Sequence, residues 1–434
     1  MKTILTGGHI VAPSGIIEGD IVIAPPFIEN VGRGYVASAT DRVIDVHGAF
    51  IMPGVIDTHV HFRQPGMTHK ATIATESRAA AAGGVTSVCE MPNCKPLTTS
   101  SEALAEKQAI AGKDSAVNFA FFIGATHDNA DVLRKVDYTT VPGIKVFMGS
   151  STGGMLVDDA DALRSVFSIS PHIPVVTHCE DTDIINENAR IHGDSSDISL
   201  HPLIRSREAC TASTRLAVRI AKECHTRLHV AHISTKEEIE LVRCAGFTAE
   251  ACIPHLFFTD KDYARLGVRI KCNPAIKTQE DRDALRRALI DGSIATVATD
   301  HAPHLLSEKL SGGCLTAPSG MPMVQFSLPT MLTMGFGYET VARLMSENPA
   351  KVFDIDRRGE IREGYFADLT VVAPEEHRTE DSDVLSLCGW TPLDGSVLSH
   401  RVKCTFVNGQ MVWDGENILN TKAAMPLHFE RKAL

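Results

Sequence analysis

The sequence predicts an α/β protein in which a (β/α)8 TIM barrel is joined to a small β-sandwich domain built from both chain termini. Three observations support this fold. The length of 434 residues suits one domain of about 250 to 300 residues plus a smaller one. In the middle of the chain, apolar strand-like stretches alternate with helical stretches, which is typical of a barrel of parallel strands. At both ends, short strands and turns replace this alternation.

The two ends share a pattern of short strands separated by glycine and proline. Near the N-terminus these strands are expected at 4–5, 10–11 and 20–23. Near the C-terminus they are expected at 359–364, 367–372 and 402–409. We therefore expect one discontinuous β-sandwich domain, 1–50 plus 355–434, and a catalytic barrel domain at 51–354.

The middle of the chain supplies eight expected barrel strands. They lie at 51–57, 85–91, 117–124, 143–148, 173–178, 227–232, 246–252 and 294–299. Helices are expected between most of them, among others at 75–84, 209–225 and 278–291. Gly83 and Gly84 end the first of these helices. An open doubly wound sheet would usually carry a glycine-rich phosphate turn after its first strand, but this first strand ends in histidines.

Composition excludes several classes of function. A net charge of −11 with no basic run opposes nucleic-acid binding. No stretch approaches the roughly 18 apolar residues of a membrane span, and the first residues lack the apolar core of a signal peptide. The 11 cysteines are scattered without a Cys-x-x-Cys pair, which favours reduced thiols in a cytoplasmic protein. We expect a small-molecule substrate and no nucleic-acid or membrane partner.

Polar side chains gather where the expected strands end, which is where barrels of this kind carry their active sites. Four histidines and an aspartate stand there: His59, His61, His178, His232 and Asp300. Residues i and i+2 of a strand point the same way, so His59 and His61 can reach one point. Imidazole and carboxylate ligands in this number suit two divalent metal ions, with zinc as the default. His59, His61 and Asp300 would hold one ion, and His178 and His232 the other.

Lys145, on the fourth strand, stands where a bridging anion is needed between two metal ions. A lysine ammonium beside two dications is disfavoured, whereas a lysine carboxylated by carbon dioxide is an anionic bridge. The residues alone leave a second interpretation open, in which the Lys145 amine reaches solvent or pairs with a carboxylate.

The motif Asp57-x-His59-x-His61, together with the other metal-site residues, resembles the cyclic amidohydrolase superfamily. The resemblance covers nearly the whole chain and is greatest to the dihydroorotases, with allantoinases and hydantoinases as related groups. The dihydroorotase motif usually continues as x-Arg-Glu-Pro-Gly, whereas Gln64 stands at the glutamate position here. We do not expect this departure to inactivate the site.

The resemblance implies a role for each residue that matches the family pattern. The five strand-end residues would be metal ligands. Those implied to bind the substrate carboxylate are Arg63, Asn93 and His304. Asn273 is implied to contact the substrate, and the backbone of the loop from Ala317 to Gly320 to meet its ring. One branch of dihydroorotases bridges its metals with an aspartate at the position of Ser151. The stretch around Lys145 instead resembles the carboxylated-lysine stretch of allantoinases and hydantoinases, which favours a carboxylated Lys145.

The implied reaction is the reversible cyclisation of N-carbamoyl-L-aspartate to (S)-dihydroorotate plus water in de novo pyrimidine biosynthesis. Two zinc ions per subunit, bridged by hydroxide and by carboxylated Lys145, would supply the nucleophile. Asp300 would be the general acid and base. Arg63 discriminates among substrates, because a guanidinium binds a ring carboxylate that allantoin and simple hydantoins lack. We also expect a homo-oligomer, either a dimer or a tetramer.

Two other functions remain open. Lys145 favours an allantoinase or a dihydropyrimidinase-type enzyme, whereas Arg63 opposes it. A non-catalytic scaffold is opposed by the presence of every metal ligand. Residues 305–319 contain Gly312 and Gly313 as a possible hinge, and we expect this segment to act as a mobile lid over the substrate.

Overall fold

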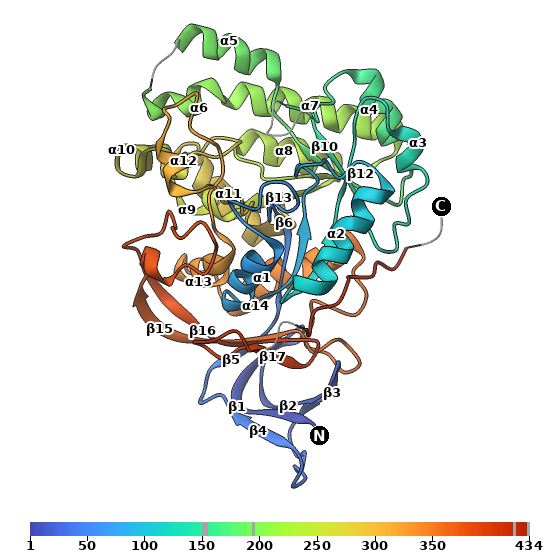
Figure 1. Cartoon of the computed structure of the whole chain (residues 1–434), viewed down its shortest axis with the longest axis vertical. Coiled ribbons are helices and arrows are strands. Elements are labelled where there is room, and N and C mark those ends of the chain that lie inside the picture. The colour runs from blue at the N-terminus through green and yellow to red at the C-terminus, as the bar shows by residue number, and fades with distance from the viewer. Residues whose placement is uncertain (150–154, 193–195, 420–421, 432–434) are drawn as a thin grey trace.

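A closed barrel of eight parallel strands stands on a sheet built from both chain ends in the computed structural model, which describes residues 1–149, 155–192, 196–419 and 422–431 (Figure 1). The barrel strands are β6 (Val55–Val60), β7 (Val85–Glu90), β8 (Asn118–Phe121) continued by β9 (Ile123–Gly124), β10 (Ile144–Phe147), β11 (Pro174–His178), β12 (Arg227–Val230), β13 (Thr248–Cys252) and β14 (Thr296–Ala298). The barrel closes where Val60 bridges His301 and the His61 N–H donates to the His301 carbonyl at 2.8 Å. The predicted barrel is thus confirmed.

The seam between the first and last strands is fastened by Asp57. Its carboxylate accepts hydrogen bonds from the Thr299 hydroxyl at 2.5 Å and from the Thr299 N–H at 3.2 Å. Burial raises the pKa of Asp57 to about 7. This residue therefore holds β6 beside the end of β14, and so places the residues that follow both strands at one rim.

Helices surround the barrel. The longer ones are α1 (Ile73–Ala82), α2 (Ser101–Asp114), α4 (Ala160–Phe167), α5 (Thr182–His192), α7 (Arg207–Cys224), α8 (Lys236–Ala245), α11 (Gln279–Asp291), α13 (Ser327–Thr333) and α15 (Asn348–Phe353). The shorter ones are α3 (Ala130–Leu133), α6 (His201–Ile204), α9 (Ile253–Phe257), α10 (Tyr263–Leu266), α12 (Leu306–Leu310) and α14 (Tyr338–Ala342). The three helices that the sequence predicted by range, α1, α7 and α11, begin and end within two residues of the expected bounds. No helix in the described ranges is long and apolar enough to cross a membrane.

Strands from the N-terminal and C-terminal parts of the chain form one mixed sheet below the barrel (Figure 1). Its strands are β1 (Thr3–Ala12), β2 (Gly15–Ala24), β3 (Phe27–Gly32), β4 (Arg42–Asp45), β5 (Phe50–Pro53), β15 (Leu369–Arg378), β16 (Val397–Val407) and β17 (Gln410–Trp413). The antiparallel pairing of β5 with β15 joins the N-terminal and C-terminal parts. The division into domains at 1–50 plus 355–434 and at 51–354 stays a prediction.

Three of the predictions about strands differ from the observed structure. Residues 51–57 were expected to form one barrel strand, but 51–53 belong to β5 of the terminal sheet and only β6 enters the barrel. Gly54 separates them, and a Cβ there would lie 2.2 Å from the Thr86 hydroxyl oxygen. Gly7 and Gly8 were expected to separate two strands, but they form an irregularity within β1, where Gly7 has φ +72°. Residues 359–364 form a turn and not a strand.

Candidate active site

The C-terminal ends of the barrel strands converge on a small cavity. Its lining consists of His59, His61, Arg63, Asn93, Phe147, His178, His232, Asn273, Asp300, Ala302, Ser319 and Gly320. Most of the predicted site residues are therefore brought together. Three of them, Lys145, His304 and Ala317, do not line this cavity.

His59, His61 and Asp300 form one group whose ligand atoms lie within 4.8 Å of one another. The His61 Nδ1–H donates to the Asn93 side-chain oxygen at 2.7 Å. The His61 Nε2 lone pair consequently faces Asp300 Oδ1 at 3.0 Å. Two acceptors face each other here, which is the arrangement that a bound cation satisfies. His59 Nε2 lies 3.5 Å from the same oxygen.

His178 and His232 form the neighbouring pair. The His178 Nε2–H donates to Glu180 at 2.9 Å, so its Nδ1 lone pair faces His232 Nε2, also at 2.9 Å. The His59 and His232 rings lie 5.2 Å apart between centroids, which joins this pair to the first group. Burial lowers the pKa of both His178 and His232. Neutral imidazoles are the form that binds metal ions.

The charge state of the first group is equally suited to a metal. Burial lowers the pKa of His61 to about 4. Burial raises the pKa of Asp300, but His59 and His61 outweigh this effect and hold it well below its usual range. His61 is therefore a neutral imidazole and Asp300 an ionised carboxylate at neutral pH.

Lys145 lies on β10, which pairs with β11, the strand that ends at His178. Its side chain is fully buried, and its Nζ has no hydrogen-bond partner among the described residues. The Lys145 Nζ lies 5.1 Å from the centroid of the Phe147 ring. Burial lowers the pKa of Lys145 to about 8. No hydrogen bond or ion pair within the described ranges joins the Lys145 amine to a carboxylate, so the structure does not support that alternative.

Three cavity residues hold the backbone in the left-handed region, which non-glycine residues rarely adopt. These are Arg63 with φ 67°, His232 with φ 35° and Asp300 with φ 48°. Each directly follows or closely follows the end of a barrel strand. Such backbone conformations persist where the surrounding structure holds them and occur often at active sites.

Sequence reasoning missed two acidic residues that orient the histidines. Glu250, on β13, accepts the His59 Nδ1–H at 2.7 Å, and Glu180 accepts from His178. Burial raises the pKa of Glu250, but His59 outweighs it and the pKa falls to about 2. The available signal was a glutamate between two alanines in an apolar strand. Cys252 also lies near His59 and Glu250, but burial raises its pKa well above the usual value, so it stays a thiol.

Replacement of Glu250 by glutamine is expected to weaken zinc binding by about 10- to 100-fold, because a neutral amide oxygen accepts the His59 Nδ1–H more weakly than a carboxylate does. Competition with a chromogenic chelator measures this affinity. A matched control is Asp368→Asn, because Asp368 is a buried carboxylate with three donors, Arg358, Asn408 and Asn118, at the base of the barrel. Equal zinc affinity in Glu250→Gln and the parent protein would contradict this role.

The side of the cavity away from the histidines is cationic. Arg63 is buried, and its Nε–H donates to the Pro303 carbonyl at 3.0 Å. The His304 ring accepts from Lys70 at Nδ1, 3.0 Å away, and its Nε2–H donates to the Ser319 carbonyl at 3.0 Å. Arg63 Nη2 lies 3.1 Å from that same Nε2, so the guanidinium faces a donor there. No carboxylate of the residues that the structure describes forms an ion pair with it. Burial lowers the pKa of Arg63 to about 10, which leaves it charged at neutral pH.

The remaining predicted substrate residues divide into two sets. Asn273 accepts from the Ser319 hydroxyl at 3.0 Å, and Gly320 lines the cavity with φ +122°. A Cβ on Gly320 would lie 2.6 Å from the Ala302 carbonyl oxygen, so no side chain fits. Ala317, by contrast, is buried away from the cavity, and its carbonyl accepts from Lys271.

The expected lid, 305–319, contains α12 and is anchored by Lys309. This buried lysine donates to the carbonyls of Lys271 at 2.8 Å, Pro318 at 2.8 Å and Gly320 at 2.6 Å. Closure of the segment over a substrate stays a prediction. Ser151, discussed above as the position of a bridging aspartate in other proteins, lies outside the described residues.

Comparisons with known proteins place the chain among hydrolases of cyclic amides. The model of the Amidohydrolase family matches residues 50–412. A dihydroorotase from Halobacterium salinarum is 39% identical over 85% of this chain and 87% of that protein. An allantoinase from Rubrobacter xylanophilus is 31% identical over 97% of this chain and 95% of that protein. The solved structure of an L-hydantoinase from Arthrobacter aurescens superposes with a TM-score of 0.94 at 27% identity, over 98% of this chain and 99% of that one.

Proposed function

The chain belongs to the amidohydrolase family, and from this premise we propose that it is a dihydroorotase that interconverts N-carbamoyl-L-aspartate and (S)-dihydroorotate. The observation that carries the proposal is the buried, charged Arg63 in the wall of the histidine-lined cavity. Dihydroorotate bears a ring carboxylate, and a guanidinium can bind it through two parallel hydrogen bonds. The similarity to the dihydroorotase of Halobacterium salinarum supports the same assignment.

The donor set fits two zinc ions. His59, His61 and Asp300 would hold one ion and His178 and His232 the other, with carboxylated Lys145 as an anionic ligand shared by both. A buried amine with its pKa lowered to about 8 has the neutral fraction that reacts with carbon dioxide. When bound, such ions lower the pKa of water and polarise the carbonyl of the scissile amide.

Asp300 would carry the proton in both directions of the reaction. In hydrolysis one ring C–N bond breaks, the carbonyl carbon gains the oxygen of water, and the ring nitrogen gains a proton. Asp300 is ionised and therefore accepts the proton from the attacking water, which it then gives to the departing nitrogen. Ring closure follows the same path in reverse. Arg63 would hold the substrate carboxylate with His304 beside it, and Asn273 and Gly320 bound the space for the ring.

Replacement of Arg63 by methionine is expected to lower kcat/KM for dihydroorotate by about 100-fold or more, because two charge-assisted hydrogen bonds are lost at roughly 1.5 to 3 kcal/mol each. Steady-state assays in both directions measure this loss, and most of it should be a higher KM. The kcat/KM of Arg63→Lys, which keeps the charge but lacks the planar guanidinium, should lie between those of the parent protein and Arg63→Met. The proposal fails if the parent protein turns over allantoin but not dihydroorotate.

An allantoinase is the second candidate. The similarity to the Rubrobacter xylanophilus protein and the lysine at position 145 favour it. An allantoinase would turn over allantoin without any need for Arg63. The assays of the parent protein and of Arg63→Met therefore separate the two functions.

A homo-oligomer, either a dimer or a tetramer, and a cytoplasmic location remain predictions from the sequence.

A further inference from the structure

His301 directly follows Asp300 and ties three parts of the rim through its backbone. Its N–H donates to the Thr299 hydroxyl at 3.0 Å, and its carbonyl accepts from the His61 N–H at 2.8 Å. It also pairs with Met321, just after the loop that carries Gly320. Any displacement of His301 would therefore move Asp300 and His61 together.

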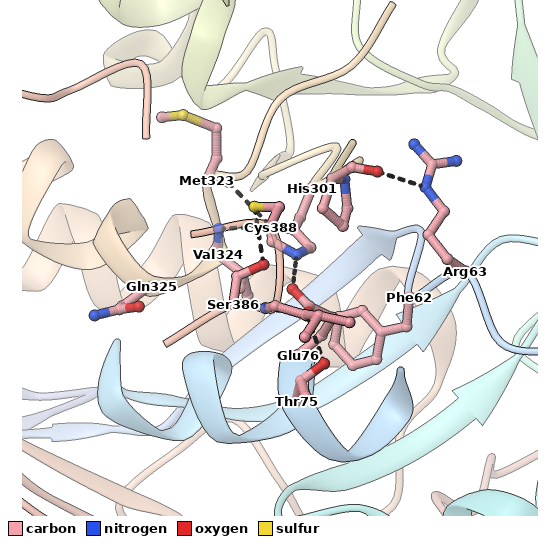
Figure 2. A network of polar contacts seen from close by, with 12 residues as sticks. Phe62, Arg63, Thr75, Glu76, His301, Met323, Val324, Gln325, Ser386 and Cys388 are labelled. Carbon is pink, nitrogen blue, oxygen red and sulfur yellow. Dashed lines mark hydrogen bonds and ion pairs between the residues drawn. The ribbon is translucent and has the colours of Figure 1, made fainter. Parts of the chain in front are cut away.

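The His301 side chain is held from two sides, as Figure 2 shows. Its Nδ1 accepts the Met323 N–H at 3.0 Å and the Val324 N–H at 3.2 Å. Two donors at Nδ1 leave the proton on Nε2, which donates to the Glu76 carboxylate at 2.8 Å. The ring thus links the chain after the substrate loop to α1.

Glu76 is fully buried in α1 and receives two further donors. The Thr75 hydroxyl donates to it at 2.7 Å (Figure 2). The Leu387 N–H also donates to it, at 3.2 Å. Leu387 belongs to residues 379–396, the connection between β15 and β16 of the terminal sheet. A carboxylate in this place accepts three hydrogen bonds, whereas a glutamine would turn an N–H group toward one of the donors.

The same connection reaches the substrate side of the site. Trp390 is fully buried, and its indole N–H donates to the His304 carbonyl at 2.8 Å. His304 is the residue whose ring contacts Arg63. Two separate hydrogen bonds, one at Glu76 and one at Trp390, therefore join residues 379–396 to the segment from Asp300 to His304.

We propose that Glu76, His301 and Trp390 are positioning residues, through which a segment of the terminal sheet sets the geometry of the proton-transfer and carboxylate-binding groups. The substrate named in this inference rests on the proposed function, whereas the hydrogen bonds of Glu76, His301 and Trp390 do not depend on it. Because Asp300 holds a left-handed backbone conformation, the surrounding contacts must maintain that conformation. Displacement of a reacting group by about 1 Å can cost about 100-fold in rate.

Glu76→Gln provides the direct test. We expect kcat/KM for dihydroorotate to fall by about 10- to 100-fold, and zinc affinity in chelator competition to fall by about 10-fold. Asp368→Asn is the matched control, because it also replaces a buried carboxylate that accepts three hydrogen bonds. It should lower the Tm to a similar extent without changing zinc affinity or turnover per folded molecule.

Trp390→Phe provides a second test that keeps an aromatic ring in place. Loss of the single N–H should raise KM by about 5-fold while kcat stays within about 2-fold, since only the carboxylate side is affected. A KM and kcat both equal to those of the parent in Trp390→Phe would overturn the inference for Trp390. If Glu76→Gln does not fold, Trp390→Phe decides the role of the connection.

The inference for Glu76 and His301 is overturned if folded Glu76→Gln matches Asp368→Asn in zinc affinity and turnover. Its failure is distinguishable from failure of the proposed function. If the parent protein does not act on dihydroorotate, the zinc titrations still test the network, and turnover is compared on whichever cyclic amide the parent hydrolyses.

Discussion

Replacement of Asp300 by asparagine is expected to lower kcat for dihydroorotate in both directions by about 10³-fold or more. General acid–base catalysis alone contributes about 10²- to 10⁴-fold, and the amide also weakens a metal ligand. The asparagine oxygen can still face His61, which lies 3.0 Å from Asp300 Oδ1. Steady-state kinetics of the zinc-replete variant, with zinc content measured on the same sample, separates proton transfer from loss of metal.

A suitable control for this variant is Asp57→Asn, because Asp57 is a buried aspartate at the same seam that bonds to Thr299 and does not line the cavity. It should lose stability but keep more activity than Asp300→Asn at equal zinc content. If Asp300→Asn with full zinc retains more than about a tenth of the parent kcat, the role as general acid and base is wrong.

Replacement of Lys145 by alanine is expected to abolish measurable turnover, a loss of about 10³-fold or more, and to lower the zinc content. The carboxylated side chain would be the anion that offsets two dications, and alanine leaves neither charge nor oxygen ligands. Acetate or propionate added with zinc should restore part of the activity, because a small carboxylate can enter the space that the side chain vacates. Zinc content and kcat are measured against carboxylate concentration.

Lys107→Ala is the matched control for this rescue. Lys107 is a second buried lysine, but it forms an ion pair with Glu90 at 2.9 Å and therefore has no need of carboxylation. It should lose stability without any response to acetate. A Lys145→Ala protein that keeps full zinc and activity, or that is not restored by any small carboxylate, would argue against the bridging role.

Local patterns were enough to predict the fold class and the metal-ligand candidates. His59 and His61 share one side of an extended chain because side chains alternate along a strand. Each of His178, His232 and Asp300 stands at the end of an apolar stretch, where a barrel carries its functional groups. The boundary between the two sheets was harder to place, because residues 51–57 form one apolar run although Gly54 divides it between β5 and β6.

The sequence by itself determined which metal-ligand candidates stand at the rim, because strand periodicity and strand ends are local features, while the candidates for carboxylate binding came from the resemblance to the dihydroorotases. Only the tertiary structure decided which groups orient them. Glu250 reaches His59 across 191 residues, Glu76 reaches His301 across 225, and Leu387 reaches Glu76 across 311. These residues become partners only when the barrel closes and when residues 379–396 pack against it. The hydrogen bonds of a buried carboxylate depend on whichever donors the fold brings to it, and no local pattern records that.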